Sequence, residues 1–288
     1  MSYKRTKYDL QDVYIKGERL KGVFSCSGGW DNPEQLLRSV GVANGFVGRT
    51  SSGQRTSTLD ISQYIISNHD PIIGLFSDTN LDGELVYGED EHPFAFTKGV
   101  IESYSCSAAV GSIPETSFSI KSYGDMGAIE DGISARDDSH AGDIIVSSPG
   151  RVVIDLNGYE TNAVQSVKVS ASIPWEPINV AGQNHPHTFI LGQPINVIAE
   201  YELFANDKES SSFEDAFCSP ETQNLNVTFY GRCDDEEEII RKVFVPAARL
   251  TSYSKNGQIQ DSLSVSLSYN ATVLTLSELG NVFSGTAF

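Results

Sequence analysis

The chain has 288 residues, of which 39% are hydrophobic, so it can bury a sizeable core in one large or two medium domains. Its 38 acidic residues outnumber its 20 basic residues, giving a net charge of -18 with no cluster of Lys and Arg, which argues against a protein that grips nucleic acid. No apolar stretch approaches the ~20 residues that a membrane helix needs, so no membrane partner is expected.

The N-terminal region predicts a short arm and, further on, a short helix. Residues 1–10 contain three basic residues with no apolar run behind them, which is typical of a flexible basic arm and not of a secretory signal. Asp31 and Asn32 precede residues 33–38, which start with proline and are followed by a glycine, the order of a capped helix of about two turns. The capping-box spacing of residues 211–214 predicts another short helix.

Most of the remaining chain alternates apolar and polar residues, the pattern of a strand with one buried face. The clearest case is 262–269, where every second residue is serine and the others are Leu, Val, Leu and Tyr. The same period runs through 117–120, 164–172 and 195–203. The sequence therefore predicts an all-β fold of β-sandwich or barrel modules with minor short helices.

An acidic stretch from Asp78 to Glu89 matches the pattern of a calcium-binding loop. Calcium prefers oxygen ligands, and the predicted set is the side chains of Asp78, Asn80 and Asp82, the main-chain carbonyl of Glu84 and the bidentate carboxylate of Glu89. The residues that follow do not form the exiting helix of an EF-hand, so a solvated acidic turn between two strands is the alternative. No other cofactor is expected.

Other polar groups have plainer interpretations. A second acidic cluster lies in a Gly- and Ser-rich segment, which favours a solvated loop: Asp131, Asp137, Asp138, His140 and Asp143. His185 and His187 flank a proline and could bind a metal, but an exposed loop at a subunit contact is the preferred interpretation. The cysteines have no CxxC spacing and are expected to be reduced: Cys26, Cys106, Cys218 and Cys233.

Catalytic motifs are absent from the sequence. It contains no phosphate-binding glycine loop, no nucleophile elbow, and no Cys or Ser paired in a motif with His. Glu115 and Glu176 follow Ile-Pro stretches in the two halves of the chain, but spacing along a chain cannot establish the geometry of paired catalytic carboxylates. We therefore expect no enzyme activity.

An internal repeat emerges when the chain is shifted on itself by 141 residues. Five identities then align without a gap: Gly17 with Gly158, Val23 with Val164, Ser25 with Ser166, Pro33 with Pro174, and Gly41 with Gly182. At a shift of 149, Ile-Glu-Ser-Tyr-Ser at 101–105 aligns with Leu-Thr-Ser-Tyr-Ser at 250–254. This predicts a duplication, with one module in residues 1–145 and the second in residues 146–288.

Several stretches of the second copy resemble the modules of bacteriophage tail tube proteins. They are the strand at 164–170, the Ile-Pro-Trp-Glu-Pro-Ile stretch at 173–178, the strand at 195–203, and the closing strands at 248–254 and 261–267. The resemblance is best over 151–275 and weaker over 10–130.

This resemblance implies a structural virion protein, assembled in the host bacterial cytoplasm, whose β modules join into rings that stack into a tube. Its expected partners are copies of itself, other tail proteins, and DNA that passes without specific binding, which a negative surface permits. Many tube proteins carry one module, so two modules per chain leave trimeric and hexameric rings open.

Two alternatives stay open. Within the same class, the chain could be a tail connector or baseplate-hub ring protein. In a different class, it could be a calcium-dependent carbohydrate-binding adhesin, with the ion at residues 78–89 and Trp30 or Trp175 stacking on a sugar.

Overall fold

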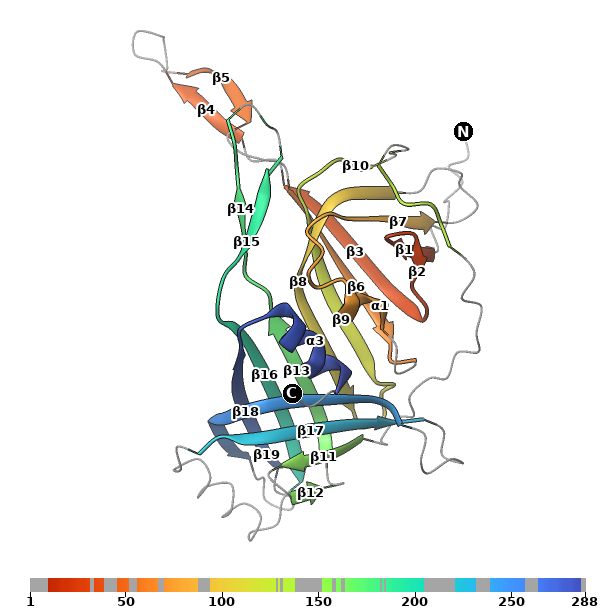
Figure 1. Cartoon of the computed structure of the whole chain (residues 1–288), viewed down its shortest axis with the longest axis vertical. Coiled ribbons are helices and arrows are strands. Elements are labelled where there is room, and N and C mark those ends of the chain that lie inside the picture. Colours follow the sequence, from red (N-terminus) through yellow and green to blue (C-terminus); the bar gives the residue numbers. More distant parts are fainter. Residues whose placement is uncertain are drawn as a thin grey trace.

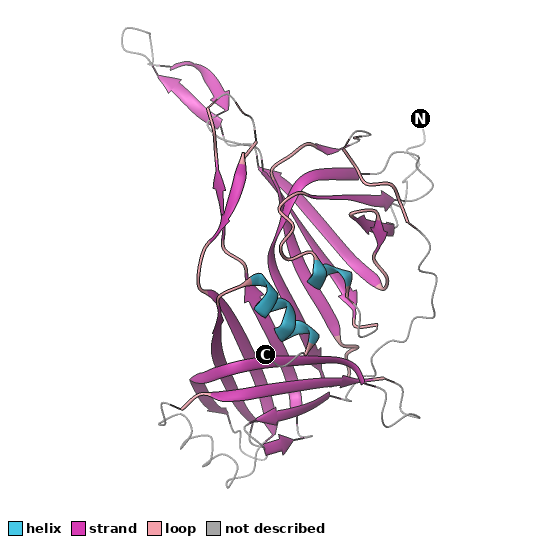
Figure 2. Cartoon of the chain, viewed as in Figure 1, coloured by secondary structure: helices cyan, strands magenta, loops and turns pink. Residues whose placement is uncertain are grey.

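A computed structural model describes residues 10–31, 34–38, 46–51, 56–66, 70–87, 94–127, 129, 132–137, 152–156, 159–161, 164–181, 183, 185–204, 221–231, 239–256 and 264–285. Antiparallel strands dominate these residues and the helices among them are short (Figure 2), which confirms the all-β prediction. Residues 1–9 of the predicted N-terminal arm, the predicted helix at 211–214 and the predicted boundary between residues 145 and 146 lie outside the described residues.

The first half of the chain contains one short helix, α1 (Pro71–Gly74), among its strands. The strands are β1 (Leu10–Ile15), β2 (Glu18–Arg19), β3 (Val23–Asp31), β4 (Glu34–Arg38), β5 (Phe46–Ser51), β6 (Thr56–Tyr64), β7 (Leu81–Tyr87), β8 (Phe94–Ala109), β9 (Glu115–Ser122) and β10 (Met126–Gly127).

The second half ends in a longer helix, α3 (Leu276–Ser284), after its last strand. The strands are β11 (Val152–Leu156), β12 (Tyr159–Thr161), β13 (Val164–Ser172), β14 (Trp175–Ile178), β15 (Thr188–Leu191), β16 (Ile195–Phe204), β17 (Gln223–Tyr230), β18 (Ile239–Asn256) and β19 (Ser264–Val273).

The two halves have the same strand order. Hydrogen-bonded neighbours run β2-β1-β7-β8-β9-β6-β3 in the first half and β12-β11-β17-β18-β19-β16-β13 in the second. Each half also has a separate hairpin that follows the third strand of that half. The hairpin β4–β5 follows β3, and the hairpin β14–β15 follows β13 (Figure 1). Every strand of one series therefore has a counterpart in the other.

Irregularities of the ladders also correspond. Matching strand pairs shift register at matching residues: 23 to 25 in β3 and 164 to 166 in β13, 81 to 83 in β7 and 223 to 225 in β17, 101 to 103 in β8 and 250 to 252 in β18. Two non-glycine residues with left-handed backbone are counterparts as well, Lys98 (φ 54) and Ala247 (φ 46). Bulges of this kind bend and re-aim a strand, so the two halves bend alike.

The bends let one strand serve two layers. In β18, residues 239–248 pair with β17 and residues 249–256 pair with β19. Figure 1 shows β17 and the first part of β18 crossing over β13 and β16 at a steep angle. In β8, the first residues pair with β7 and the later ones with β9. Each half is thus a sandwich of two crossed layers linked by one long bent strand.

Residues 34–38, predicted as a helix, form strand β4, so that prediction is wrong. β4 pairs antiparallel with β5 from Glu34 to Arg38. A helix of two turns has few internal hydrogen bonds and depends on tertiary packing for its stability. Pairing within a hairpin supplies the backbone partners instead. The repeat supports this result, because the corresponding residues after β13 also begin a hairpin strand.

Candidate functional site

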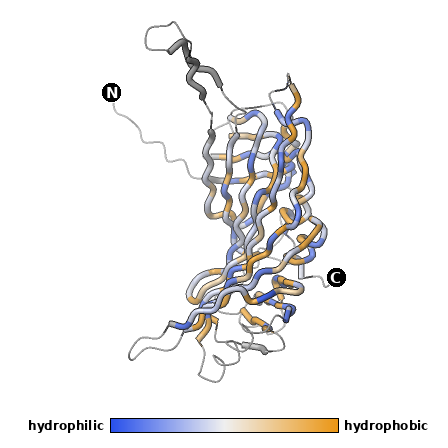
Figure 3. The backbone as a smooth tube through the Cα atoms, turned by 90° about the vertical axis from the view of Figure 1, so that its left-hand side faces the viewer, coloured by the Kyte–Doolittle hydropathy of each residue, from blue (hydrophilic) through white to orange (hydrophobic). Residues whose placement is uncertain are grey.

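The strands β3-β6-β9-β8-β13-β16-β19-β18 form a continuous stretch of sheet that crosses both halves. One side packs on the core, where Val167 and Val169 of β13 are buried. The other side, called here the open face, carries Lys168 and Ser170, because successive strand residues point to opposite sides. Figure 3 shows this alternation as blue and orange segments along neighbouring strands.

Hydroxyl side chains dominate the open face. They align across strands in register: Ser103, Ser105, Ser107, Ser117, Ser119, Ser166, Ser170, Ser172, Ser252, Ser254, Ser266 and Ser268. A hollow of about 600 Å³ lies in this face and is lined from both halves. Its charged lining residues are Glu115, Glu200, Glu202 and Lys168, so carboxylates outnumber the single ammonium group.

The described residues that line the hollow include no His to act as a base toward a serine hydroxyl and no Cys to act as a nucleophile. Ser107 and Ser166 donate long hydrogen bonds of 3.4 Å to Glu115 and Glu202. Glu115 and Glu176 are not brought together: Glu115 lines the hollow, whereas Glu176 lies exposed on the β14–β15 hairpin beyond the other end of β13. The described residues of the open face form a polar surface of hydroxyl groups and carboxylates.

The two halves meet edge to edge between β8 and β13. These strands pair antiparallel from Ser103 opposite Ser172 to Ala109 opposite Ser166. Main-chain bonds extend the ladder, with the Ile173 amide donating to the Glu102 carbonyl at 2.7 Å. This contact, called here the internal joint, makes one sheet of two modules.

A buried charge network supports the internal joint from behind. Arg241 of β18 lies 3.1 Å from the Asp70 carboxylate. Its Nη1 also donates to the Tyr104 hydroxyl at 3.0 Å and to Thr116 at 3.3 Å. The Tyr104 hydroxyl in turn donates to Asp70 at 2.6 Å, and the Gln63 amide donates to the same carboxylate at 3.2 Å. One residue of the second half thus binds four of the first half's groups, directly or through Asp70.

The network lies away from water. Arg241 is 4% exposed and the Asp70 side chain is 0% exposed. Burial raises the pKa of the Tyr104 hydroxyl well above its usual value, and the Asp70 charge raises it further, so Tyr104 stays a neutral donor. Asp70 also accepts from the Ile72 amide and so caps α1. No local pattern in the sequence indicates this pair, because Asp70 and Arg241 lie 171 residues apart.

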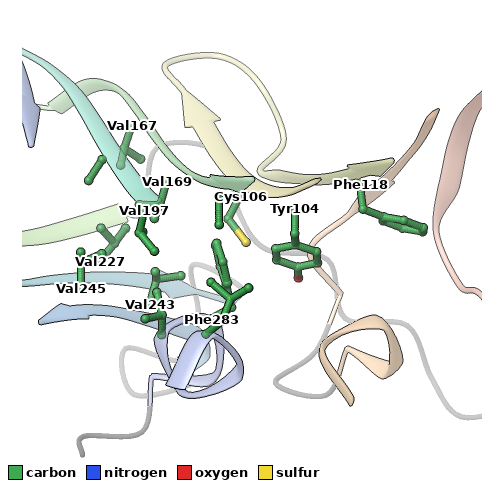
Figure 4. Close-up of a cluster of buried hydrophobic side chains, with 14 of the residues drawn as sticks. Tyr104, Cys106, Phe118, Val167, Val169, Val197, Val227, Val243, Val245 and Phe283 are labelled. Atoms are coloured by element: carbon green, nitrogen blue, oxygen red, sulfur yellow. The ribbon is translucent and has the colours of Figure 1, made fainter. Parts of the chain in front are cut away.

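Helix α3 fills the remaining space at the internal joint. Phe283 meets Tyr104 edge to face, with ring centroids 4.6 Å apart, and it also contacts Phe76 at 6.3 Å. Figure 4 shows Phe283 between Val243 of the second half and Tyr104 of the first. A capping box at Thr275 and Glu278 starts this helix and fixes its position.

The acidic stretch predicted to bind calcium forms the start of β7. Asp82 and Glu84 lie within the strand, and Asp78 precedes it, 3.3 Å from the Lys16 ammonium. The Asp82 carboxylate accepts from the amide and hydroxyl of Ser134 at 2.6 and 3.1 Å and lies 3.5 Å from the same ammonium.

Two more residues of the predicted calcium set have contacts within the chain. The Glu84 side chain is paired with Arg136 at 2.6 Å, and the main-chain amide of Asn80 donates to the Asp78 carboxylate at 2.8 Å. Glu89 lies outside the described residues. In the part of the chain that the structure describes, no group of three His, Cys, Asp or Glu side chains is placed to hold a metal. Calcium would compete with Lys16, Ser134 and Arg136 for these carboxylates, and its binding stays a prediction.

Other predicted residues have structural contacts. His185 lies 2.6 Å from the Tyr123 carbonyl and ties the β14–β15 hairpin to the first half. The Trp175 indole donates to the Ile101 carbonyl at 2.9 Å and is half-buried. The Asp137 amide donates to the Gly17 carbonyl at 2.7 Å. The side chain of Trp30 and the rest of the second acidic cluster, Asp131, Asp138, His140 and Asp143, lie outside the described residues.

Comparison with known proteins gives no family. No protein-family model matches the chain, and no curated protein matches it significantly. Within the described residues, no helix has the length and apolar composition needed to cross a bilayer.

Proposed function

We propose that the chain is a non-catalytic structural protein that assembles with copies of itself, as a subunit of a bacteriophage tail tube whose stacked rings enclose a passage for DNA. The internal joint carries the proposal: two modules of one topology already share a continuous sheet within one chain. A ring needs only that the same kind of contact be repeated between chains. Closure then removes the sheet edges, which otherwise invite uncontrolled pairing.

The open face suits the wall of such a passage. Serine hydroxyls cover it, and carboxylates outnumber Lys168 around its hollow. DNA that passes a basic wall would be held by the release of counterions, whereas an acidic and hydroxyl-rich wall lets it slide. The overall charge of -18 has the same consequence.

The duplication bears on ring size. Three chains present six modules around an axis, and six chains present twelve. We propose the trimer, because six modules suit the sixfold tubes of the family that the sequence resembles.

Electron microscopy of the purified protein over a range of concentrations, combined with native mass spectrometry, tests the proposal. Closed rings or tubes with one central channel are expected. A stable monomer at every concentration, or a channel lined mainly by Lys and Arg, would contradict it. A glycan array separates the adhesin alternative: the tube subunit gives no hits, with or without calcium.

A further inference from the structure

We propose that residues 252–256 of β18 pair antiparallel with residues 27–31 of β3 in a second copy of the chain, in the register of the internal joint. This contact would be the interface between chains in the assembly proposed above, and the inference rests on that proposed function. The inference starts from the repeat: β18 is the counterpart of β8, and β3 is the counterpart of β13. The internal joint pairs β8 with β13. The chain therefore contains a second set of the same two strands, β18 and β3, which do not pair with each other in the described residues.

Both strands have a free edge in the part of the chain that the structure describes. β3 pairs only with β6. Residues 249–256 pair only with β19, since the bend has carried β18 away from β17. Edges of this kind are templates for another strand. Because the two edges are different strands, the contact between chains is heterologous and propagates from chain to chain until a ring closes.

The matching irregularities of the ladders determine which residues of the two halves correspond. Ser25 of β3 corresponds to Ser166 of β13, an offset of 141 residues, and Ser103 of β8 corresponds to Ser252 of β18, an offset of 149 residues. In the internal joint Ser170 faces Ser105. Gly29 is the counterpart of Ser170 and Ser254 is the counterpart of Ser105. The same register therefore puts Gly29 of one chain opposite Ser254 of the next.

Residues at the two edges of the proposed contact are more exposed than their counterparts in the internal joint, as expected if a partner chain covers them. Tyr104 and Val169 in the internal joint are 0% exposed, whereas Tyr253, the counterpart of Tyr104, is half-buried and Gly28, the counterpart of Val169, is exposed. Docking of the edges would cover both. Burial of an aromatic side chain such as Tyr253 is a large source of interface energy.

Side-chain size is complementary at the inner side of the proposed contact. Val169 faces Cys106 in the internal joint, two residues of moderate size. The same register sets Gly28 opposite Lys255. The long side chain of Lys255 thus meets a residue without a side chain, which leaves room for the methylene stem of the lysine to lie across the neighbouring strand.

Cysteine cross-linking of the full chain tests the register. The variant Gly29→Cys with Ser254→Cys places one thiol on each edge, and a side chain at Gly29 meets nothing within 4 Å. Mild oxidation of assembled protein is expected to give disulfide-linked chains on non-reducing gels. Ser105→Cys with Ser170→Cys, the counterpart in the internal joint, is the matched control and should close within one chain. Ser25→Cys with Ser254→Cys is out of register, and each single variant reports background from native cysteines.

The outcomes separate this inference from the proposed function. Cross-linked chains from the in-register pair, with none from the out-of-register pair, support both. Rings in which the in-register pair stays reduced while the internal control closes overturn the contact and leave the tube subunit standing. A protein that never assembles overturns the contact and the proposed function together.

Discussion

Tyr104 and Tyr253 occupy the same place in the repeated bent strand, but their surroundings differ. Tyr104 is enclosed by Arg241, Asp70 and Phe283. Tyr253 lies half-buried at a free edge. The first environment exists because the second module follows the first in the chain and supplies β18 and α3. The comparison teaches that the internal joint is specialised, because a charged network and an aromatic helix pack behind its paired strands.

The two halves are also closed differently after their last long strand. Residues 132–137 follow β9 and are held on β7 by Asp82 and Glu84. The corresponding part of the second half is α3, with Leu279, Val282 and Phe283 buried. A polar strap in one half therefore takes the place of an apolar helix in the other.

The largest expected effect comes from breaking the network of the internal joint. Arg241→Ala leaves the Asp70 carboxylate buried without its cation, and removal of one partner of a buried ion pair costs about 3–5 kcal/mol. Denaturant unfolding of the full chain measures the loss.

The matched control is Arg249→Ala, on the same strand but exposed, with an expected change within about 0.5 kcal/mol. A loss below about 1 kcal/mol for Arg241→Ala would show that the internal joint does not depend on this network.

The sequence predicted the all-β class because alternation along a strand reports burial directly, as in Val265 and Leu267 of β19. It also contained the repeat that the strand order displays. It could not predict Arg241 with Asp70, because such a pair depends on how the halves dock and leaves no periodic signal. The prediction of a helix at 33–38 was wrong for a related reason, because pairing between β4 and β5 outweighed the local helix signal. Likewise, the acidic pattern at 78–89 is a feature of composition, while the partners of Asp82 come from distant segments.

The strap that closes the first half can be tested at Asp82. Asp82→Ala removes the acceptor of two Ser134 hydrogen bonds and a partner of Lys16, and bonds to a charged group contribute about 1.5–3 kcal/mol. We expect a loss of about 2 kcal/mol in denaturant unfolding. Asp12→Ala, which breaks a more exposed ion pair with Arg19, should cost less than about 1 kcal/mol. Equal losses in the two variants would refute the strap.

The same Asp82 variant tests the calcium prediction. Calorimetric titration with millimolar calcium should give heat for the natural chain and none for Asp82→Ala if the acidic stretch binds the ion. No heat with either protein ends that prediction without affecting the strap.

The apolar closure of the second half depends on the start of α3. Thr275→Ala removes the side chain that accepts from the Glu278 amide at 3.1 Å, and loss of such a cap costs about 1 kcal/mol. Ser277→Ala, on the exposed side of the same helix, should cause no loss because alanine is the better helix former. Thr275→Ser should retain most of the stability. A Thr275→Ala protein as stable as the natural chain would mean that packing of the buried residues Leu279, Val282 and Phe283 positions α3 without the cap.

The smallest expected effect is a change in the reactivity of Cys26, and it reports on the free edge of β3. Cys26 is the counterpart of the buried Val167, but it is only half-buried. Burial, and then the Asp60 charge, raise its pKa to about 11, and the thiolate is the reactive form. At pH 8 alkylation, followed by mass spectrometry of the Cys26 peptide, should therefore be slow and should accelerate as the pH rises toward 11. Asp60→Asn removes one cause of the raised pKa and should speed the reaction at pH 8 by roughly twofold to tenfold. If β3 of one chain is covered by β18 of the next, assembled protein should react more slowly than monomer at the same pH. Equal rates in the two states would place the contact between chains elsewhere.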